Sequence, residues 1–268
     1  GSNICVFVGG VLTDTLSYYP NSLVRGQLCK WLYPKANYFI ASSHAVARDL
    51  SRYDIKMSKI SVIPSSINSE ELALYAQKRG KISSERFSKQ RKIVFIGRLV
   101  PIKRADLAID ALVLLKEKNT SYQLLIIGDG PDTRALKEKV RALGKKQQVK
   151  FLAKTTKPWS YLIDTDVLVL PSDSEGSPKI LLEAMYIGVS VITTDWPGVT
   201  EIIKHNKNGV IVLRDSSRQL ARGIERVINN PGLRDRLAEN SQASIGKYDI
   251  KKTIKIYEGI FKRLSLRS

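Results

Sequence analysis

The chain has 268 residues, of which 43% are hydrophobic and 26% are charged, and this balance excludes an intrinsically disordered protein. Its 44 Lys and Arg residues outnumber its 25 Asp and Glu residues, giving a formal net charge of +19, so the surface attracts anions such as nucleic acid, lipid headgroups or phosphorylated substrates. No run of about 18 apolar residues occurs, which excludes a membrane-spanning helix within this sequence.

Cysteine and histidine usage narrows the chemistry further. Cys5 and Cys29 are too few for a disulfide framework and show no metal-binding spacing. His44 and His205 belong to no paired or HExxH pattern, which disfavours zinc. We therefore expect a cytoplasmic protein without a metal or other cofactor.

The first 70 residues contain three short apolar runs with strand character, at Ile4–Val8, Tyr38–Ala41 and Ile60–Ile63. Leu23–Leu32 has helical spacing, and Ser42 or Ser43 can cap a helix that begins near His44. Three strands are only part of a sheet, so we expect residues 3–70 to form a partial Rossmann-like domain.

Strand and helix patterns alternate regularly after a polar, basic stretch at residues 71–90, which we expect to be an interdomain linker of helix and loop. The expected strands are Ile93–Ile96, Gln123–Ile127, Val149–Leu152, Val167–Leu170, Val189–Thr193 and Gly209–Leu213. The expected helices are Ala105–Lys118, Thr133–Leu143, Lys157–Leu162, Pro178–Tyr186 and, near the end, 216–229, 231–245 and 250–264. Buried strands separated by helices indicate a parallel sheet with right-handed crossovers. The predicted fold class is α/β, with a complete doubly wound Rossmann-like sheet in residues 91–248 and ligands bound outside the carboxyl ends of its strands.

The loop after Val167–Leu170 carries the strongest candidate site. Ser177 is a good N-cap and Pro178 a good first residue for the next helix, whose free N–H groups and positive dipole end can seat a phosphate. Glu175 precedes this helix, and Glu183 lies about 7–8 Å along its axis from Pro178, at 1.5 Å per residue. One carboxylate on each side of a phosphate seat suits a nucleoside diphosphate sugar. By spacing alone, a capping acid and a solvated surface glutamate fit as well or better.

A second loop supplies positive charge. Gly97 follows the strand Ile93–Ile96 and lets the backbone approach a ligand, while Arg98 and Lys103 can reach into the same crevice. Arginine and lysine can neutralise the charge that develops on a departing diphosphate without a metal. No acidic pair of the D-x-D type follows a strand, which disfavours a magnesium-dependent enzyme.

Missing motifs disfavour two other ligand classes. The turn containing Gly128 and Gly130 is not a GxGxxG sequence, and that fingerprint is absent throughout, which counts against a nicotinamide or flavin enzyme. No recognition-helix, zinc-finger or RNP-like pattern accompanies the basic charge, which disfavours nucleic acid. An anionic membrane face and a solvated surface without any partner remain as explanations of the charge.

Taken together, these loops resemble the family four type of retaining glycosyltransferases with the GT-B fold. The matching segments are FIGRLVPIKR, LLIIGDGP, VKFLAKT, DVLVLPSDSEGSPKILLEAM and VSVITTDWPGVTEII, in the family's order and spacing. The most specific is the E-x7-E signature formed by Glu175 and Glu183. The resemblance covers roughly residues 35–268, and residues 249–268 resemble a helix that crosses back to the N-terminal domain.

The resemblance implies a role for each candidate residue. The implied catalytic residues are Glu175, which would contact the donor sugar near the reacting carbon, and Arg98 and Lys103, which would bind the donor diphosphate. The implied substrate-binding residues are Glu183 for ribose, Lys154 near the base, Gly97, Gly130, and the backbone of Gly176, Ser177, Pro178, Lys179 and Ile180 for sugar hydroxyls and phosphate oxygens.

The implied activity is transfer of a hexose or N-acetylhexosamine, with retention and without a metal, from a UDP- or GDP-linked donor to a lipid-linked or polysaccharide acceptor. UDP is slightly favoured, and we expect a place in polysaccharide biosynthesis, peripheral on the inner membrane face. Gly9 and Gly10 stand where many members have a histidine, and the family's first strands precede residue 3. A donor-binding subunit or non-catalytic homologue that needs a partner chain is therefore a second hypothesis. An epimerase or phosphorylase is a third.

Overall fold

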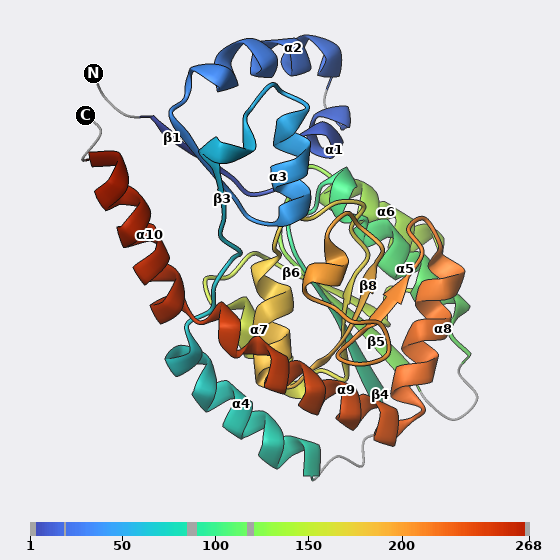
Figure 1. Ribbon diagram of the computed structural model, residues 1–268. Helices are drawn as coiled ribbons and strands as arrows, with labels where there is room; N and C mark the ends of the chain where they lie inside the picture. The colour runs from blue at the N-terminus through green and yellow to red at the C-terminus, as the bar shows by residue number, and fades with distance from the viewer. Residues whose placement is uncertain (1–3, 19, 85–89, 117–120, 266–268) are drawn as a thin grey trace.

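The protein folds around two parallel sheets (Figure 1). The computed structural model describes residues 4–18, 20–84, 90–116 and 121–265. The smaller sheet has the strand order β1-β2-β3, and the larger sheet has the order β6-β5-β4-β7-β8-β9. In the larger sheet the order reverses between β4 and β7. This is the topological switch point at which open parallel α/β sheets bind ligands.

The smaller sheet is the less covered of the two. Its elements are β1 (Cys5–Val8), β2 (Tyr38–Ala41), β3 (Ile60–Val62), α1 (Leu12–Ser17), α2 (Ser22–Leu32), α3 (His44–Ser51) and the 3₁₀ turns η1 (Tyr33–Lys35) and η2 (Met57–Lys59). Phe39 of β2 and Leu50 of α3 are fully buried in one apolar cluster, whereas α2 has no buried residue. The sequence pattern did not predict α1, because its six residues are too few to show a helical period.

The larger sheet is covered by helices on both faces. Its strands are β4 (Gln90–Ile96), β5 (Ser121–Ile127), β6 (Val149–Leu152), β7 (Val167–Leu170), β8 (Ser190–Thr194) and β9 (Val210–Val212). The helices α5 (Ala105–Leu114), α6 (Thr133–Ala142) and α8 (Ser217–Ile228) share one apolar cluster with it, and α4 (Ser69–Ser84), α7 (Lys179–Ile187) and η4 (Pro158–Asp164) share the other. Helix α9 (Pro231–Ser244) contacts both α7 and α8. Because consecutive residues of a strand face opposite ways, Ile93 and Val94 of β4 fall in different clusters.

These elements confirm the predicted parallel sheet, with differences in local detail. The segment expected as the helix Lys157–Leu162 is the 3₁₀ helix η4, and the helix expected over Ala105–Lys118 ends at Leu114. At that point Leu115 turns to an extended conformation and the Lys116 N–H donates to the Glu225 carboxylate. Residues 85–89 of the expected linker lie outside the described residues, and the domain boundaries stay a prediction.

Helix α4 is packed against the larger sheet's helices although it lies within the expected linker. Leu72 is buried among residues of α7 and η4. The buried Arg79 guanidinium donates to the carbonyl oxygens of Leu162, Thr165 and Gly188 at 3.0, 2.6 and 2.9 Å. Because helix and loop ends leave carbonyls without partners, Arg79 satisfies acceptors at the ends of both η4 and α7.

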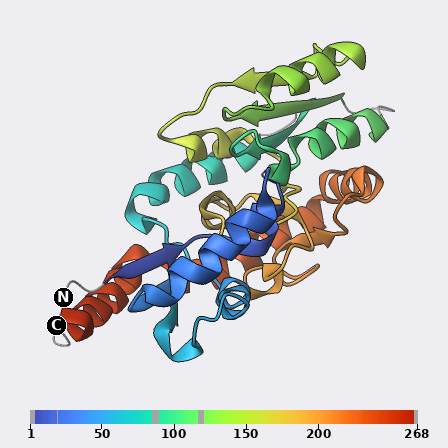
Figure 2. The same cartoon turned by 90° about the horizontal axis from the view of Figure 1, so that it is seen from above.

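Helix α10 (Ile250–Ser265) runs from the larger sheet to the smaller one. Its Ile260 is buried with Ile40 of β2 and Ile63, and the end of α10 lies beside β1 in both views (Figures 1 and 2). The helix therefore joins the two sheets on the side away from α3. Across the described ranges, no helix is both long and apolar enough to cross a membrane.

Replacing Arg79 should destabilise the protein without changing its charge distribution near the cleft described below. We expect Arg79→Met to lower the free energy of unfolding by about 2–4 kcal/mol, because several buried carbonyl groups lose their donor. Urea denaturation measures this loss. The matched control is Arg134→Met on α6, where the side chain is 91% exposed and the expected change is small. Equal effects of the two substitutions would contradict this role for Arg79.

Candidate active site

A cleft of about 750 Å³ lies at the switch point, between the two sheets. One wall is formed by the loop after β1 and by α1, through Gly9, Gly10, Thr15 and Tyr18. The other wall is formed by the loops after β4, β5 and β7, and its polar side chains are Arg98, Lys103, Asp132, Ser174 and Glu175. The predicted sites in the loops after β4 and β7 therefore meet in one cavity.

Glu175 and Lys103 form an ion pair inside this cleft. The Lys103 Nζ lies 2.6 Å from each Glu175 carboxylate oxygen, and the Ser172 hydroxyl donates to Oε1 at 2.7 Å. The Lys103 side chain is 19% exposed and the Glu175 side chain is 7% exposed. Charge-assisted bonds in such a poorly hydrated place are strong, so the pair fixes the loop after β4 to the loop before α7.

Arg98 brings a second cation to the cleft. Its side chain is exposed, and it forms no hydrogen bond or ion pair with any residue that the structure describes. Close packing of the loops after β4 and β5 holds its backbone: a Cβ on Gly128 would lie 1.9 Å from the Gly97 carbonyl oxygen, and one on Gly130 would lie 2.2 Å from that of Leu99. Gly130 itself does not line the cleft. Its role in the structure is to let Leu99 and the Arg98 loop pack this closely.

Glu183 does not line the same cleft as Glu175. It is 3% exposed on the face of α7 that packs against α4 and η4, and Lys179 Nζ lies 3.5 Å from its Oε1. The same ammonium lies 5.7 Å from the centre of the Trp159 ring. Burial raises the pKa of Glu183 to about 7, and Lys179 opposes this shift only partly. The expected placement of both acids around one cavity is not seen, because Glu183 is buried where α7 packs against α4 and η4.

The start of α7 also differs from the prediction. The helix begins at Lys179, with Pro178 as an N-cap that offers no side-chain hydrogen bond. The Ser177 hydroxyl does not cap the helix; it accepts from the Ser65 N–H at 3.0 Å, while the Ser65 hydroxyl donates to the Ser177 carbonyl at 2.5 Å. Since no side chain caps it, the first turn of α7, including Ile180, keeps N–H groups available for a ligand.

Two further contacts join the sheets beside the cleft. A Cβ on Gly176 would lie 2.1 Å from the Gly9 carbonyl oxygen, so no other residue fits between these backbones. The Glu201 carboxylate accepts from the N–H groups of His44 and Ala45, each at 3.0 Å, at the start of α3. The sequence predicted the cap from Ser43 but not this one, because Glu201 lies more than 150 residues along the chain.

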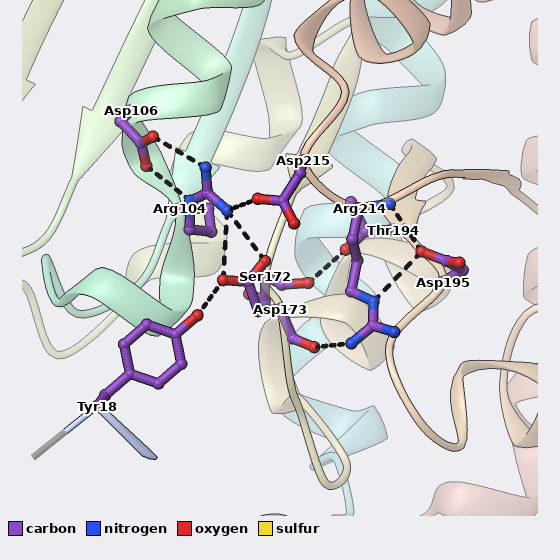
Figure 3. A network of polar contacts seen from close by, with 9 residues as sticks. All are labelled: Tyr18, Arg104, Asp106, Ser172, Asp173, Thr194, Asp195, Arg214 and Asp215. Carbon is purple, nitrogen blue, oxygen red and sulfur yellow. Dashed lines mark hydrogen bonds and ion pairs between the residues drawn. The ribbon is translucent and has the colours of Figure 1, made fainter. Parts of the chain in front are cut away.

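A polar network supports the loop that carries Glu175 (Figure 3). Arg104 donates to Asp173 at 3.2 Å and also pairs with Asp106 and Asp215. Tyr18 from α1 donates to the other side of Asp173, and burial together with this carboxylate raises the pKa of Tyr18. Sequence reasoning assigned no role to Arg104, Asp173 or Tyr18; the available signal was only that Arg104 follows Lys103 in the FIGRLVPIKR segment.

Two further expectations concern metal binding and the contact of Lys154 with the nucleotide base. Among the residues that the structure describes, no three His, Cys, Asp or Glu side chains gather in a group that could hold a metal ion. Lys154 is exposed in the loop after β6 and does not line the cleft.

The raised pKa of Glu183 should make stability depend on pH. The folded protein holds the proton more tightly than the unfolded chain, so the stability gained from this group is complete below about 4.5 and is lost as pH rises to about 7. The free energy of unfolding of the parent protein should fall by up to roughly 3 kcal/mol across that interval, and we expect this fall to be absent in Glu183→Gln. Urea denaturation from pH 4 to 8 measures the difference, with the exposed Glu138→Gln as the control. A constant difference between Glu183→Gln and the parent protein would contradict the raised pKa.

Known proteins resemble this chain in sequence and in architecture. Residues 77–244 match the family described as Glycosyl transferases group 1. An uncharacterized glycosyltransferase of Haemophilus influenzae is 28% identical over 63% of this chain and 48% of that protein. A Campylobacter jejuni alpha-1,4-N-acetyl-D-galactosaminyltransferase, named for a diNAcBac-PP-undecaprenol-linked GalNAc acceptor, is 32% identical over 61% of this chain and 46% of that protein. The chain thus spans about half the length of these two relatives.

A solved structure gives the same result for the fold. The crystal structure of Anabaena HepE in complex with UDP-glucose matches with a TM-score of 0.82 and 20% identity, over 98% of this chain and 72% of that chain. Because 98% of this chain is covered, its likeness extends over both sheets. With a family match across residues 77–244 and this architecture, the chain belongs to the Glycosyl transferases group 1 family and has the GT-B fold.

Proposed function

We propose that this protein transfers a sugar, with retention and without a metal, from a nucleoside diphosphate sugar to a lipid-linked or polysaccharide acceptor. The observation that carries the proposal is the cleft at the switch point, where Arg98, unpaired among the described residues, and the Lys103–Glu175 pair lie beside the uncapped start of α7. We propose that the enzyme is of the family four type, with Glu175 and Glu183 as its E-x7-E signature.

The donor diphosphate is assigned to the positive side of the cleft. Arg98 can bind phosphate oxygens in a bidentate manner, and the first N–H groups of α7 add the positive end of the helix dipole. Lys103 neutralises Glu175 in the cleft and is within reach of a ligand bound there. As the sugar leaves, negative charge grows on the diphosphate, and fixed cations in a poorly hydrated site stabilise that charge most in the transition state.

Retention is assigned to a front-side route, in which the leaving and attacking oxygens share one face of the sugar. Both oxygens of Glu175 already accept hydrogen bonds, one of them from Ser172 as well as Lys103. A carboxylate held in this way is suited to orienting a sugar near its reacting carbon. It is less suited to acting as a nucleophile, which needs a free oxygen.

Glu183, Lys179 and Lys154 are assigned to the nucleoside end. Lys179 is the first residue of α7 and lies beside Trp159, and Glu183 follows one helical turn later. The proposed ribose contact of Glu183 therefore lies beyond the first turn of α7, and its pKa of about 7 lets it donate or accept near neutral pH. The UDP-glucose complex of HepE supports a UDP-linked donor.

The smaller sheet is assigned to the acceptor. The lipid-linked acceptor named for the Campylobacter jejuni relative supports an acceptor of that class. The net charge of +19 supports peripheral binding to the anionic inner face of a membrane. We extend this to a place in polysaccharide biosynthesis.

A second candidate is a donor-binding subunit whose cleft is completed by another chain. Strand β1 stands at the edge of its sheet, and α2 beside it has no buried residue, so this half offers surface for further structure. Calorimetry separates the two candidates: nucleotide binding without turnover, followed by turnover when a partner chain is added, favours the subunit.

Nucleotide binding tests the proposed cleft directly. We expect UDP-glucose or another nucleotide sugar to raise the melting temperature, in a panel of UDP, GDP and ADP with their sugars. Arg98→Ala should weaken binding by about 10- to 100-fold, because a charged hydrogen-bond donor to phosphate is lost. Arg222→Ala, at an exposed position of α8, is the control. Equal affinity in Arg98→Ala and Arg222→Ala would place the phosphates elsewhere.

Turnover tests the ion pair and the absence of a metal. Glu175→Gln keeps the shape of the side chain and should lower kcat by about 100-fold or more, since the charge near the reacting carbon is lost. Lys103→Met should also destabilise the fold by roughly 3–5 kcal/mol, because it leaves a buried carboxylate unpaired, and the double variant with Glu175→Gln should recover most of this loss. Transfer should survive a chelator. Undiminished transfer by Glu175→Gln would overturn the assignment.

A further inference from the structure

The cleft contains one neutral group that the proposed chemistry leaves unused, the Ser174 hydroxyl. Glu175 and Lys103 are bound to each other, Thr15 donates to the Val11 carbonyl at 2.8 Å, and Tyr18 donates to Asp173. The Ser174 Oγ is buried and has no hydrogen-bond partner among the described residues, although Ser174 lines the cleft. Its capacity to donate and accept is therefore free.

Two other serines near Ser174 do have hydrogen-bond partners. Ser172, two positions earlier, donates to Glu175, and Ser177, three positions later, accepts from Ser65. Within the described part of the chain, three other buried side-chain atoms lack a partner, in Asp14, Ser42 and Trp159, and none of these residues lines this cleft. A buried hydroxyl without a partner is unfavourable by about 1–3 kcal/mol, which a ligand bound there can recover.

The surroundings of Ser174 favour a neutral ligand group over a phosphate. It lies between Asp173 and Glu175, whose carboxylates are 14% and 7% exposed and are each paired with a cation, and residues 171–178 contain no Lys or Arg that could bind a phosphate. Gly176 packs against the Gly9 carbonyl just beyond, so the chain closes the cleft on that side. A sugar hydroxyl or acylamino group is neutral and can both donate to and accept from a serine.

We propose that Ser174 determines which sugar the cleft accepts, by a hydrogen bond from its hydroxyl to one polar substituent of the transferred sugar. This assignment rests on the proposed function. A donor that lacks the substituent would leave Ser174 unsatisfied again, and a site built in this way rejects the analogue.

The stability of the protein without ligand separates this role from a structural one. Because the hydroxyl has no partner, Ser174→Ala should leave the melting temperature unchanged or raise it. The control is Ser241→Ala on α9, whose buried hydroxyl donates to the carbonyls of Met185 and Ala238 at 3.2 and 2.7 Å. That variant should melt at a lower temperature and bind nucleotide sugars as the parent protein does.

The binding experiment uses calorimetry with UDP, UDP-glucose and the 2-, 3-, 4- and 6-deoxyglucose forms of UDP-glucose. We expect Ser174→Ala to weaken UDP-glucose binding by about 5- to 100-fold while changing UDP binding less than twofold. For one of the deoxy donors, the parent protein and Ser174→Ala should bind equally, since the partner of the hydroxyl is then absent from both.

Each other outcome has a definite meaning. If UDP-glucose binds the parent protein but Ser174→Ala binds it equally well, the assignment of Ser174 is overturned and the proposed function stands. An equal loss for UDP and UDP-glucose, or for all four deoxy donors, also overturns it, because the effect is then not directed at one substituent. If neither UDP nor UDP-glucose binds the parent protein, the UDP-sugar function fails, and this assignment fails with it.

Discussion

The ion pair between Lys103 and Glu175 is the interaction on which the arrangement of the cleft depends. It ties the loop after β4 to the loop before α7, and these loops flank the switch point of the larger sheet. Two buried charges that satisfy one another in this way are unfavourable to separate. Further hydrogen bonds stabilise the residues around this ion pair. Ser172 donates to Glu175. The Thr194 hydroxyl donates to the Ser172 carbonyl, and Arg104 donates to Asp173 (Figure 3).

The two sheets meet through backbone rather than through large side chains at the cleft. Gly176 touches Gly9, Ser65 and Ser177 exchange two hydrogen bonds, and Glu201 binds the first N–H groups of α3. A contact made of small residues and polar groups brings the walls close while leaving room beside it for a ligand.

Much of the fold could be predicted from the sequence because the signals are local. Buried runs such as Val167–Leu170 read as strands, and a parallel sheet brings the loops at their carboxyl ends together, which placed Arg98, Lys103 and Glu175 in one cavity. The direction of Glu183 could not be predicted, because it depends on how α4 and η4 cover α7. Ser177 was misread as a cap because its partner, Ser65, lies in the segment after β3, more than 100 residues away in the chain. The contacts of Tyr18 and Glu201 join residues more than 150 positions apart, and no local pattern reports them.

The carboxylate of Glu201 at the start of α3 has a consequence for relative movement of the two sheets. The carboxylate binds the N–H groups of His44 and Ala45, and its bond to His44 is exposed to solvent. Water can therefore hydrate both the carboxylate and these N–H groups when the walls part. Exchange of protein hydrogen bonds for water bonds changes the free energy little. Such a contact therefore selects one orientation of the halves through its geometry, while adding little by itself to the free energy of separating them.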